Sequence, residues 1–208
     1  GFLSDHLKLD EFFDEVFTHT GHKISVKTRI GTENTDEFFK LLEVYNKYPI
    51  YELTIHPRLL AEQYRGLAHR ESFMYAVCNS KNPIVYNGDI RNKNDVEALK
   101  LEMQGSGSSD GLRIMIGRGA IADPSIFRQI KGGEPLTQDE LGTILDEVER
   151  GYFSFLANDT QVLFRLKEMW TWLIQTFKGN KKLYKKLLKS KSLEEFRLWQ
   201  DAILEEVF

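Results

Sequence analysis

The stretch 83-PIVYNGDI-90 decides between two folds for the first half of the chain. Its β-branched and aromatic residues favour a strand, while Asn87-Gly88 is the commonest pair in a two-residue hairpin turn. A hairpin needs a second strand directly after the turn. None follows, because the chain runs into a helical pattern at residues 94–103. The stretch is therefore interpreted as a buried strand that ends in an amide, a glycine and a carboxylate.

Strand and helix patterns alternate on both sides of this stretch. Strands are expected at residues 23–31, 51–57, 83–90 and 112–119, with helices at 9–17, 35–45, 70–80, 94–103 and 123–130. The strands recur about every 30 residues, which is typical of βαβ units. This alternation predicts an α/β fold with parallel strands buried on both faces. Pro57 is expected to stop the second strand, and Thr35 to cap the helix after the first.

From about residue 134 the pattern is helical only. Helices are expected within residues 135–156, 161–177, 178–192 and 192–208, and capping-box pairs stand at Thr137/Glu140 and Ser192/Glu195. The pattern predicts two domains, residues 1–132 and an all-α helical bundle at 133–208, with a boundary near Gly132-Gly133. The segment GSGSS at residues 105–109 is expected to be a flexible surface loop.

Composition narrows the class of protein. The 208 residues are 41% hydrophobic and 28% charged with a net charge of −3, which is typical of a soluble globular protein. A nucleic-acid role would need a local basic patch. The single cysteine, Cys78, excludes an intrachain disulfide and is expected to be a buried core thiol. No apolar run reaches the roughly 18 residues of a membrane span, so a cytoplasmic protein without membrane contact is expected.

Polar side chains gather where each expected strand ends. Ligands of parallel α/β folds bind at the carboxyl ends of the strands, and three of these four ends carry a cation, so an anionic ligand is expected. The residues are Lys27 and Arg29, then His56 and Arg58, then Asn87, Gly88 and Asp89, then Gly117 and Arg118.

Each of these residues also has a purely structural interpretation. His56 beside Pro57 could cap a loop, and residues 87–89 could form only a turn. Gly117 with Arg118 suits a phosphate, but a capping glycine beside a solvated arginine would look the same. Lys27 is harder to explain structurally, because a lysine at the inner end of a buried strand must find an anion or an acceptor.

Residues 178–191 form the most basic segment of the chain, with seven lysines and no acid. Tyr184, Leu187 and Leu188 lie on the opposite stripe, so an amphipathic helix is expected. The lysines are either a solvated face or a surface that follows the phosphates of a nucleic acid. The proposed RNA-binding residues are Lys178, Lys181, Lys182, Lys185 and Lys186, extended by Arg165 and Lys167.

Taken in order and spacing, four segments together resemble the tRNA-dihydrouridine synthases: SVKTRIG (25–31), LTIHPR with EQYRG (53–66), PIVYNGDI (83–90) and IMIGRGAIADPSIF (114–127). The resemblance extends over essentially the whole chain. It implies that residues 1–132 are the C-terminal half of an FMN-binding (β/α)8 TIM barrel, with about four parallel strands. Residues 133–208 would be the family's helical tRNA-binding domain.

The resemblance also implies a reaction. Family members reduce particular uridines of tRNA to 5,6-dihydrouridine, with NADPH as reductant and FMN as the hydride carrier. Carried over by motif, Lys27 would contact the flavin ring, and His56 and Arg58 would lie over the flavin and towards its phosphate. Residues 87–89 would belong to the cofactor loop, and Gly117 and Arg118 would hold the phosphate.

Two features of the family have no counterpart in these residues. The first four barrel strands are absent, and so is the catalytic cysteine of a Gly-Cys-Pro motif, which Cys78 does not match. The chain is therefore expected to be an inactive fragment that pairs with the missing half of the barrel or self-associates through exposed sheet edges. Two alternatives remain: a non-redox (β/α) barrel enzyme that binds a sugar phosphate, and an RNA-binding module.

Overall fold

The computed structural model describes residues 1–104 and 111–208, which divide into two compact units. The first comprises Gly1–Ile90 with Asn94–Ile116, and the second comprises Arg91–Lys93 with Gly117–Phe208. The expected GSGSS loop lies outside the described residues. The division at Ile116–Gly117 precedes the boundary expected near residue 132, because the short helices α5 (Arg118–Ala122) and α6 (Ile126–Ile130) group with the helical unit.

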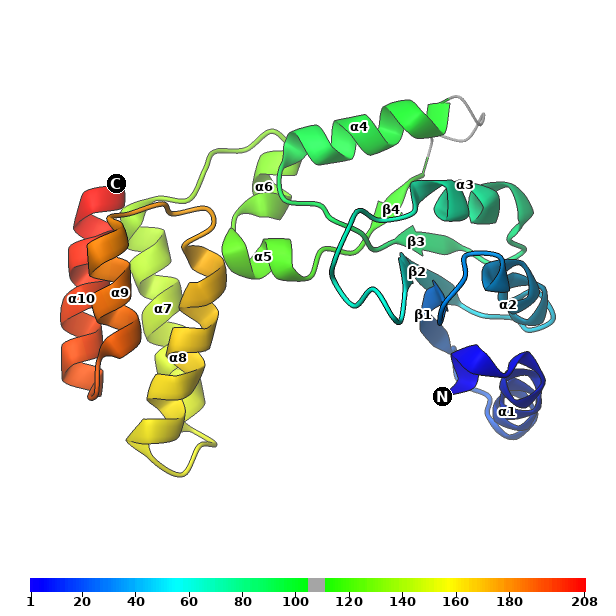
Figure 1. The fold of residues 1–208 in the computed structure, drawn as a ribbon, viewed down its shortest axis with the longest axis horizontal. Helices are drawn as coiled ribbons and strands as arrows, with labels where there is room; N and C mark the ends of the chain where they lie inside the picture. Colours follow the sequence, from blue (N-terminus) through cyan, green and yellow to red (C-terminus); the bar gives the residue numbers. More distant parts are fainter. Residues whose placement is uncertain (105–110) are drawn as a thin grey trace. The chain divides into compact units, whose positions relative to one another are not determined.

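A four-stranded parallel sheet forms the centre of the first unit. Strands β1 (Ser25–Gly31), β2 (Glu52–Leu59), β3 (Ile84–Tyr86) and β4 (Arg113–Ile114) lie side by side in sequence order (Figure 1). Both neighbours of β3 run parallel to it, so the hairpin interpretation of residues 83–90 is wrong. The prediction of an α/β fold with four parallel strands is confirmed.

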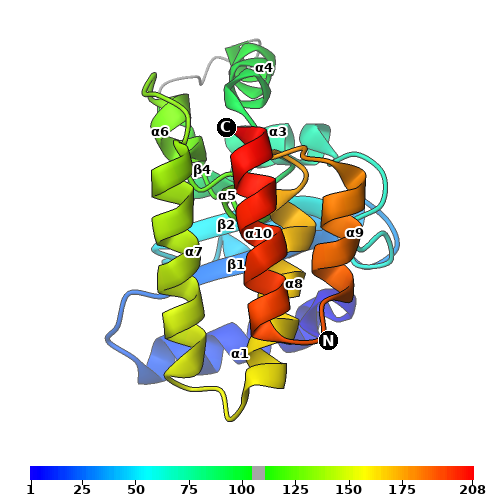
Figure 2. The same ribbon diagram turned by 90° about the vertical axis from the view of Figure 1, so that its left-hand side faces the viewer.

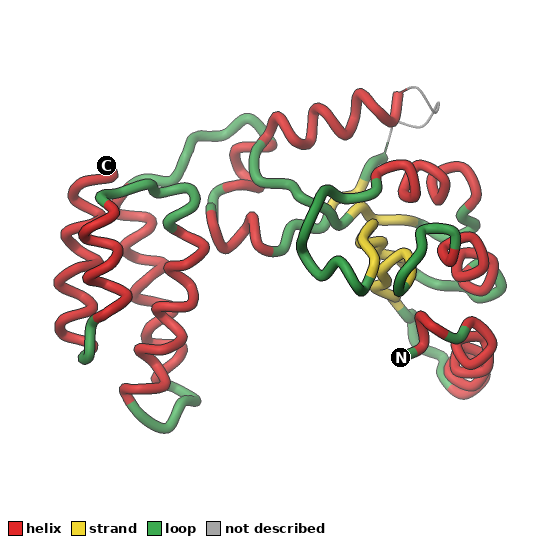
Figure 3. The backbone as a smooth tube through the Cα atoms, viewed as in Figure 1, coloured by secondary structure: helices red, strands yellow, loops and turns green. Residues whose placement is uncertain are grey.

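Helices follow the strands of this unit in alternation. They are the 3-10 helix η1 (Phe2–Ser4) and the α-helices α1 (His6–His19), α2 (Glu37–Tyr45), α3 (Arg70–Asn79) and α4 (Lys93–Gln104). The core is made by apolar residues from the strands and the facing helix surfaces, among them Ile30, Phe38, Leu53, Ile55 and Phe73, which are fully buried. Figure 3 shows the strands, in yellow, framed by the helices of this unit.

Strand β2 continues past Pro57 to Leu59, contrary to prediction. Arg29 pairs with His56, but Gly31 pairs with Leu59, so β2 carries an extra residue at this point. Such a bulge accommodates a proline, which cannot donate to the ladder. The expectation that all strands are buried on both faces also fails for β1, which exposes Ser25 and Lys27.

Two further local predictions are corrected by the structure. Thr35 does not cap α2; the carboxylate of Glu37 instead accepts the backbone N–H groups of Thr32, Glu33 and Asn34 at 2.7–2.9 Å. These bonds lower the pKa of Glu37 to about 2 against an opposing effect of burial. Cys78 is exposed, because α3 buries the face that carries Ser72, Phe73 and Ala76.

The second unit is built from helices alone. After α5 and α6 come α7 (Gln138–Phe153), α8 (Asp159–Leu173), α9 (Lys181–Lys189) and α10 (Leu193–Val207), with α9 packed against α10 (Figure 2). Their core includes the fully buried Trp170, Leu187, Phe196 and Ile203. Across the described ranges, every helix is too short or too polar to cross a membrane.

The expected capping box at the start of α7 is confirmed, with Thr137 and Glu140 bonded reciprocally. The second one is only half formed. Ser192 accepts the backbone N–H of Glu195 at 3.2 Å, but the Glu195 carboxylate accepts from Lys191 at 2.8 Å and not from Ser192.

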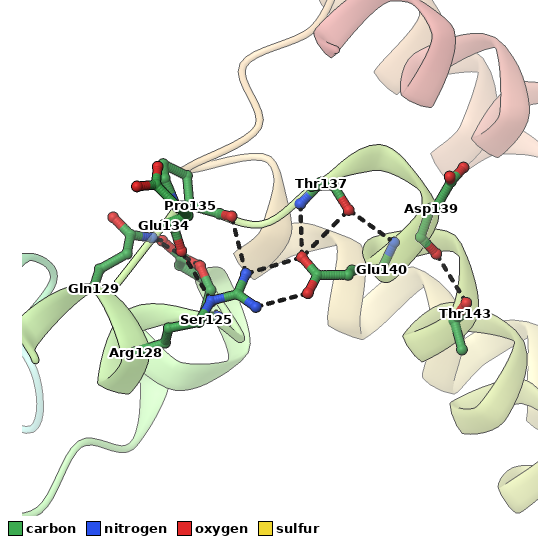
Figure 4. Close-up of polar contacts among 10 residues, drawn as sticks. Ser125, Arg128, Gln129, Glu134, Pro135, Thr137, Asp139, Glu140 and Thr143 are labelled. Carbon is green, nitrogen blue, oxygen red and sulfur yellow. Dashed lines mark hydrogen bonds and ion pairs between the residues drawn. The ribbon is translucent and has the colours of Figure 1, made fainter. Parts of the chain in front are cut away.

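The segment around Gly132-Gly133 is held by the side chain of Arg128 (Figure 4). Its guanidinium donates to the carbonyls of Glu134 and Pro135 at 2.8 and 2.9 Å and forms a bidentate pair with Glu140 at 2.6 and 2.9 Å. A side chain at Gly133 would come within 2.6 Å of Arg128 Cγ. The two glycines are therefore part of a closed turn between α6 and α7, which explains why no division falls there.

Candidate functional site

Charged side chains from β1, β2 and the residues after β3 gather around His56 within the first unit. Lys27 and Arg29 come from β1, and His56 and Arg58 from β2, with Arg29 directly beside His56 in the ladder. Asp89 follows β3. The charges of all four neighbours act on the His56 ring. The structure thus brings together Lys27, Arg29, His56, Arg58 and Asp89. Their role in binding a ligand remains a prediction.

His56 is the centre of this cluster. Its side chain is buried, and its pKa falls from 6.5 to about 4, first because of burial and then because of the charges of Arg29, Lys27 and Arg58. Asp89 opposes the shift only in part. The imidazole is therefore neutral at neutral pH and offers one N–H donor and one acceptor nitrogen.

Arg58 is the most deeply buried cation of the site, with 1% of its surface exposed. It forms an ion pair with Asp89, and its Nη1 donates to the carbonyl of Arg65 at 2.5 Å. Its Nε is buried without a hydrogen-bond partner among the described residues. A buried donor without a partner costs free energy, so Nε suits an acceptor atom of a ligand.

The exposure of the Lys27 side chain differs from what the sequence predicts. The side chain is exposed and not enclosed at the inner end of a buried strand, because β1 alternates exposed and buried positions. Partial desolvation and the nearby Arg29 lower the pKa of its ammonium group. Lys27 therefore adds positive charge to the open side of the cluster.

Asn87 and Gly88 each have a structural role in the fold. The side chain of Asn87 donates to the carbonyl of Met115 at 2.9 Å, and its backbone N–H donates to Ile55 at 2.9 Å. A side chain at Gly88 would lie 2.1 Å from Tyr86 Oη, so only glycine fits. The side chain of Asp89 contacts the cationic cluster through Arg58.

Arg29 was expected at a strand end but was given no role of its own, and Tyr64 was not among the predicted site residues. Arg29 Nη1 donates to the carbonyls of Leu59 and Gln63 at 2.7 and 3.0 Å, and its guanidinium lies 5.6 Å from the Tyr64 ring. The same ring lies 6.2 Å from His56. Alternation along a strand puts Arg29 on the same side as Lys27, which agrees with its place in the cluster. Tyr64 lies in an irregular loop and carried no such signal.

Gly117 and Arg118 belong to the second unit. Gly117 is the N-cap of α5, and Arg118 is its first residue. The Arg118 guanidinium lies 5.7 Å from the centroid of the Trp172 ring on α8. Their predicted contact with a phosphate remains a prediction.

The lysines of α9 lie on the exposed face of the helix, as the sequence predicted. Lys181, Lys182, Lys185 and Lys186 are exposed, as is Lys178 before the helix, while Leu187 is fully buried. Lys186 also lies 4.1 Å from the Trp199 ring. The amphipathic arrangement is confirmed, and the role of the lysines in binding RNA remains a prediction.

The two residues proposed to extend this surface have partners within the unit. Lys167 is half-buried, and its ammonium donates to the carbonyl of Ser190 at 2.5 Å, at the end of α9. Arg165 is exposed and pairs with Glu168 at 2.8 Å. Lys167 therefore ties α8 to α9, and Arg165 is the better candidate of the two for an external contact.

The donor set of the cluster fits an anionic ligand with a polar, planar ring. Three cations, a neutral imidazole and the unpartnered Arg58 Nε offer donors to oxygen and nitrogen acceptors, as a flavin mononucleotide requires. Among the described residues, no three His, Cys, Asp or Glu side chains form a group that could hold a metal ion.

Comparison with known proteins identifies the family of the chain. A family model described as dihydrouridine synthase matches residues 3–207. A tRNA-dihydrouridine(16) synthase of Neisseria meningitidis serogroup A is 25% identical over 190 residues, which are 88% of this chain and 55% of that protein. The corresponding protein of Shewanella oneidensis is 28% identical over 84% of this chain and 53% of its own length. A probable tRNA-dihydrouridine synthase of Aquifex aeolicus is 29% identical over 53% of this chain and 33% of its own length.

The chain thus spans about half the length of the first two of these relatives and a third of the other.

Proposed function

Since the chain belongs to the dihydrouridine synthase family, we propose that the protein containing it reduces uridine to 5,6-dihydrouridine in tRNA, with FMN as cofactor and NADPH as reductant. The observation that carries the proposal is the family match over residues 3–207, and the cationic cluster around His56 supports it. The four parallel strands are, on this proposal, half of a (β/α)8 barrel. The cytoplasmic location remains a prediction.

The residues of the first unit would hold the cofactor in distinct ways. Arg58, fixed by Asp89, would present its Nε to an acceptor atom of the ligand. His56 would meet the ring as a neutral group, so at neutral pH it accepts or donates a hydrogen bond without adding a fourth positive charge. Lys27 and Arg29 would balance the negative charge of the bound anion. Gly117 and Arg118 are proposed for the phosphate on the family resemblance.

When bound, the flavin supplies the hydride that saturates the C5–C6 bond of uridine. The second hydrogen must arrive as a proton from an acid. A histidine with a pKa of about 4 is not that acid at neutral pH. Cys78, exposed on α3, is not at a strand end either. We therefore expect the proton donor outside these 208 residues, and no catalysis by the 208-residue chain alone.

The lysines of α9 are proposed to contact the phosphates of tRNA. Their ammonium groups are exposed on one helix face, where counterions can be exchanged for phosphates.

The test uses the purified full-length protein that contains this chain. We expect a yellow protein with flavin absorbance that forms dihydrouridine in unmodified tRNA when NADPH is added. A colourless protein that turns over a sugar phosphate would favour the non-redox barrel enzyme. A colourless protein that only binds tRNA would favour the RNA-binding module.

A matched test addresses the fragment. The 208-residue chain alone should form no dihydrouridine under the conditions in which the full-length protein is active. Dihydrouridine formed by the chain alone would mean that the acid lies within these residues.

A further inference from the structure

Residues 60–69 connect β2 with α3 and form a loop whose two ends lie close together, within the first unit. The backbone N–H of His69, the last residue of the loop, donates to the carbonyl of Pro57 on β2 at 2.7 Å. A compact surface loop with adjacent ends is an Ω-loop, and such loops are frequently functional. This segment, the β2–α3 loop, is therefore a candidate for a role at the cationic cluster.

The side chain of Glu62 closes the β2–α3 loop. Its Oε2 accepts the backbone N–H of Leu59, at the end of β2, at 2.8 Å, and its Oε1 lies 2.7 Å from Nε2 of His69. Burial raises the pKa of Glu62, but the bonds from Leu59 and His69 outweigh burial and hold the pKa below its ordinary value. The carboxylate is therefore ionised at neutral pH and can only accept, so His69 Nε2 is the donor. Glu62 and His69 thus form a clasp between the two ends of the loop.

The closed loop supplies acceptors to both arginines of the cationic cluster. Arg29 donates to the carbonyl of Gln63 at 3.0 Å, and Arg58 donates to the carbonyl of Arg65 at 2.5 Å. Both carbonyls lie within the segment that the clasp closes. The positions of the two guanidinium groups therefore depend on the loop remaining closed.

The backbone of the loop is strained at Gln63. Across residues 1–104 and 111–208, Gln63 is the one residue other than glycine with a positive φ, at 54°. Such a conformation costs free energy and persists only where the surrounding structure holds it, which is common at ligand sites. The clasp formed by the preceding residue and the bond from Arg29 to the Gln63 carbonyl supply that hold.

We infer that the clasp of Glu62 with His69 is a positioning device, which keeps the β2–α3 loop closed and so holds the two arginines of the cluster ready for their ligand. The inference rests on the proposed function, in which that ligand is FMN. A guanidinium group that is already ordered loses less rotamer entropy on binding than a free one. Both residues of the clasp act through the loop carbonyls and not by touching the ligand.

The test measures the affinity of the full-length apoprotein for FMN by the quenching of flavin fluorescence. His69→Leu removes the donor of the clasp and should raise the dissociation constant about 2- to 12-fold for each arginine that must then be ordered on binding. His69→Gln keeps an N–H donor and should restore most of the affinity. An unchanged dissociation constant in His69→Leu would overturn the inference, whereas a parent protein that binds no FMN would remove the proposed function itself.

Glu71 offers a matched control beside the clasp. Its carboxylate lies 3.3 Å from Nδ1 of the same histidine, but its side chain is 74% exposed and belongs to α3. Glu71→Ala should leave the dissociation constant for FMN unchanged, because His69 Nε2 keeps its bond to Glu62. A loss in Glu71→Ala as large as that in His69→Leu would show an effect of charge and would overturn the role of the clasp.

Hydrogen exchange of the full-length apoprotein shows whether the effect passes through the loop. The amides of residues 59–69 should exchange faster in His69→Leu than in the parent, while those of α2 keep their rates. Glu62→Ala should also speed this exchange and weaken FMN binding, and adding His69→Leu to it should have no further effect. Weaker FMN binding with unchanged exchange across the loop would overturn the positioning role.

Discussion

The two units carry their positive charge in opposite ways. In the first, Arg58 is buried and paired with Asp89, and His56 is kept neutral among three cations. In the second, the lysines of α9 remain exposed on one face of a helix. A buried charge depends on its partner for stability, whereas a hydrated charge does not. Removing the charge partner of Arg58 should therefore destabilise the first unit, whereas removing lysine charges from α9 should leave the second unit folded.

The difference follows from the elements that carry the charges. Strand register places Arg29 beside His56, so charges from separate segments are forced together at the sheet edge. In α9 the helical period alone sorts the residues, with Leu187 inward and the lysines outward. Substitutions should therefore change the free energy of unfolding strongly in the first unit and weakly in the second.

The largest effect is expected for Asp89→Ala. The substitution leaves Arg58, with 2% of its side chain exposed, without its carboxylate, which should cost about 3–5 kcal/mol of unfolding free energy. Urea unfolding measures the loss. Glu52→Ala is the matched control, because Glu52 pairs with Arg113, whose side chain is 50% exposed, and should cost about 1 kcal/mol or less. Equal losses in the two variants would contradict the comparison.

The next effect is a pH dependence caused by His56. Its pKa of about 4 in the folded protein lies below the ordinary 6.5, so the unfolded chain binds a proton first as the pH falls. The contribution of His56 to the unfolding free energy is therefore at its full value above pH 6.5. It is lost as the pH falls from about 6.5 to 4, by at most about 1.4 kcal/mol per pH unit.

His56→Gln should flatten the pH dependence of the unfolding free energy in this window. Carboxylates also lose stabilisation at low pH, so the quantity compared is the difference between parent and variant at each pH. Parallel curves for the two proteins would show that His56 is not held neutral by its surroundings.

A smaller effect is expected for Gly88→Ala. The new methyl group would lie 2.1 Å from Tyr86 Oη, and overpacking of this kind costs about 1–3 kcal/mol. Gly21→Ala is the control, because a side chain there meets nothing within 4 Å and should change stability by about 0.5 kcal/mol or less. Chemical denaturation of the two variants decides between a packing role for Gly88 and one limited to ligand binding.

The smallest effect on unfolding is expected for the lysines of α9. Changing Lys181, Lys182, Lys185 and Lys186 to Gln should leave the fold intact, since surface changes are usually within about 0.5 kcal/mol each. The affinity of the full-length protein for tRNA should nevertheless fall, and the salt slope should decrease by about one unit per lost phosphate contact.

A salt titration of tRNA binding is the measurement for the α9 variant. Lys40→Gln with Lys81→Gln, two exposed lysines of the first unit, is the control and should leave the slope unchanged. Superimposable titrations for the parent and the α9 variant would mean that these lysines are only a solvated face.

Several features were predictable because they depend on neighbours in the chain. The α9 stripe, the capping box of Thr137 with Glu140 and the strand character of residues 84–86 all rest on local periodicity or spacing. The positions of His56 and Arg58 late in β2 and of Asp89 after β3 agree with the same alternation, whereas Lys27 lies in the first half of β1. Their functional roles depend on the family relationship and remain to be tested.

Other features depended on contacts between distant segments. The bulge that carries β2 past Pro57 is set by pairing with β1, and the closed turn at Gly132-Gly133 is set by Arg128 and Glu140. Arg29 donates to the carbonyls of Leu59, the last residue of β2, and of Gln63 in the loop that follows. The packing of α3 leaves Cys78 exposed.

The amino-acid pattern alone determined which segments are helix or strand and that cations stand at the strand ends. Only the tertiary structure decided which of these charges are buried, paired or exposed. The physical reason is that periodicity acts over one or two turns of the backbone, whereas burial and ion pairing depend on strand register and on helix packing. The sequence pattern predicts both Lys27 and Arg58 at strand ends, yet Lys27 lies exposed in the first half of β1 and Arg58 is enclosed beside Asp89.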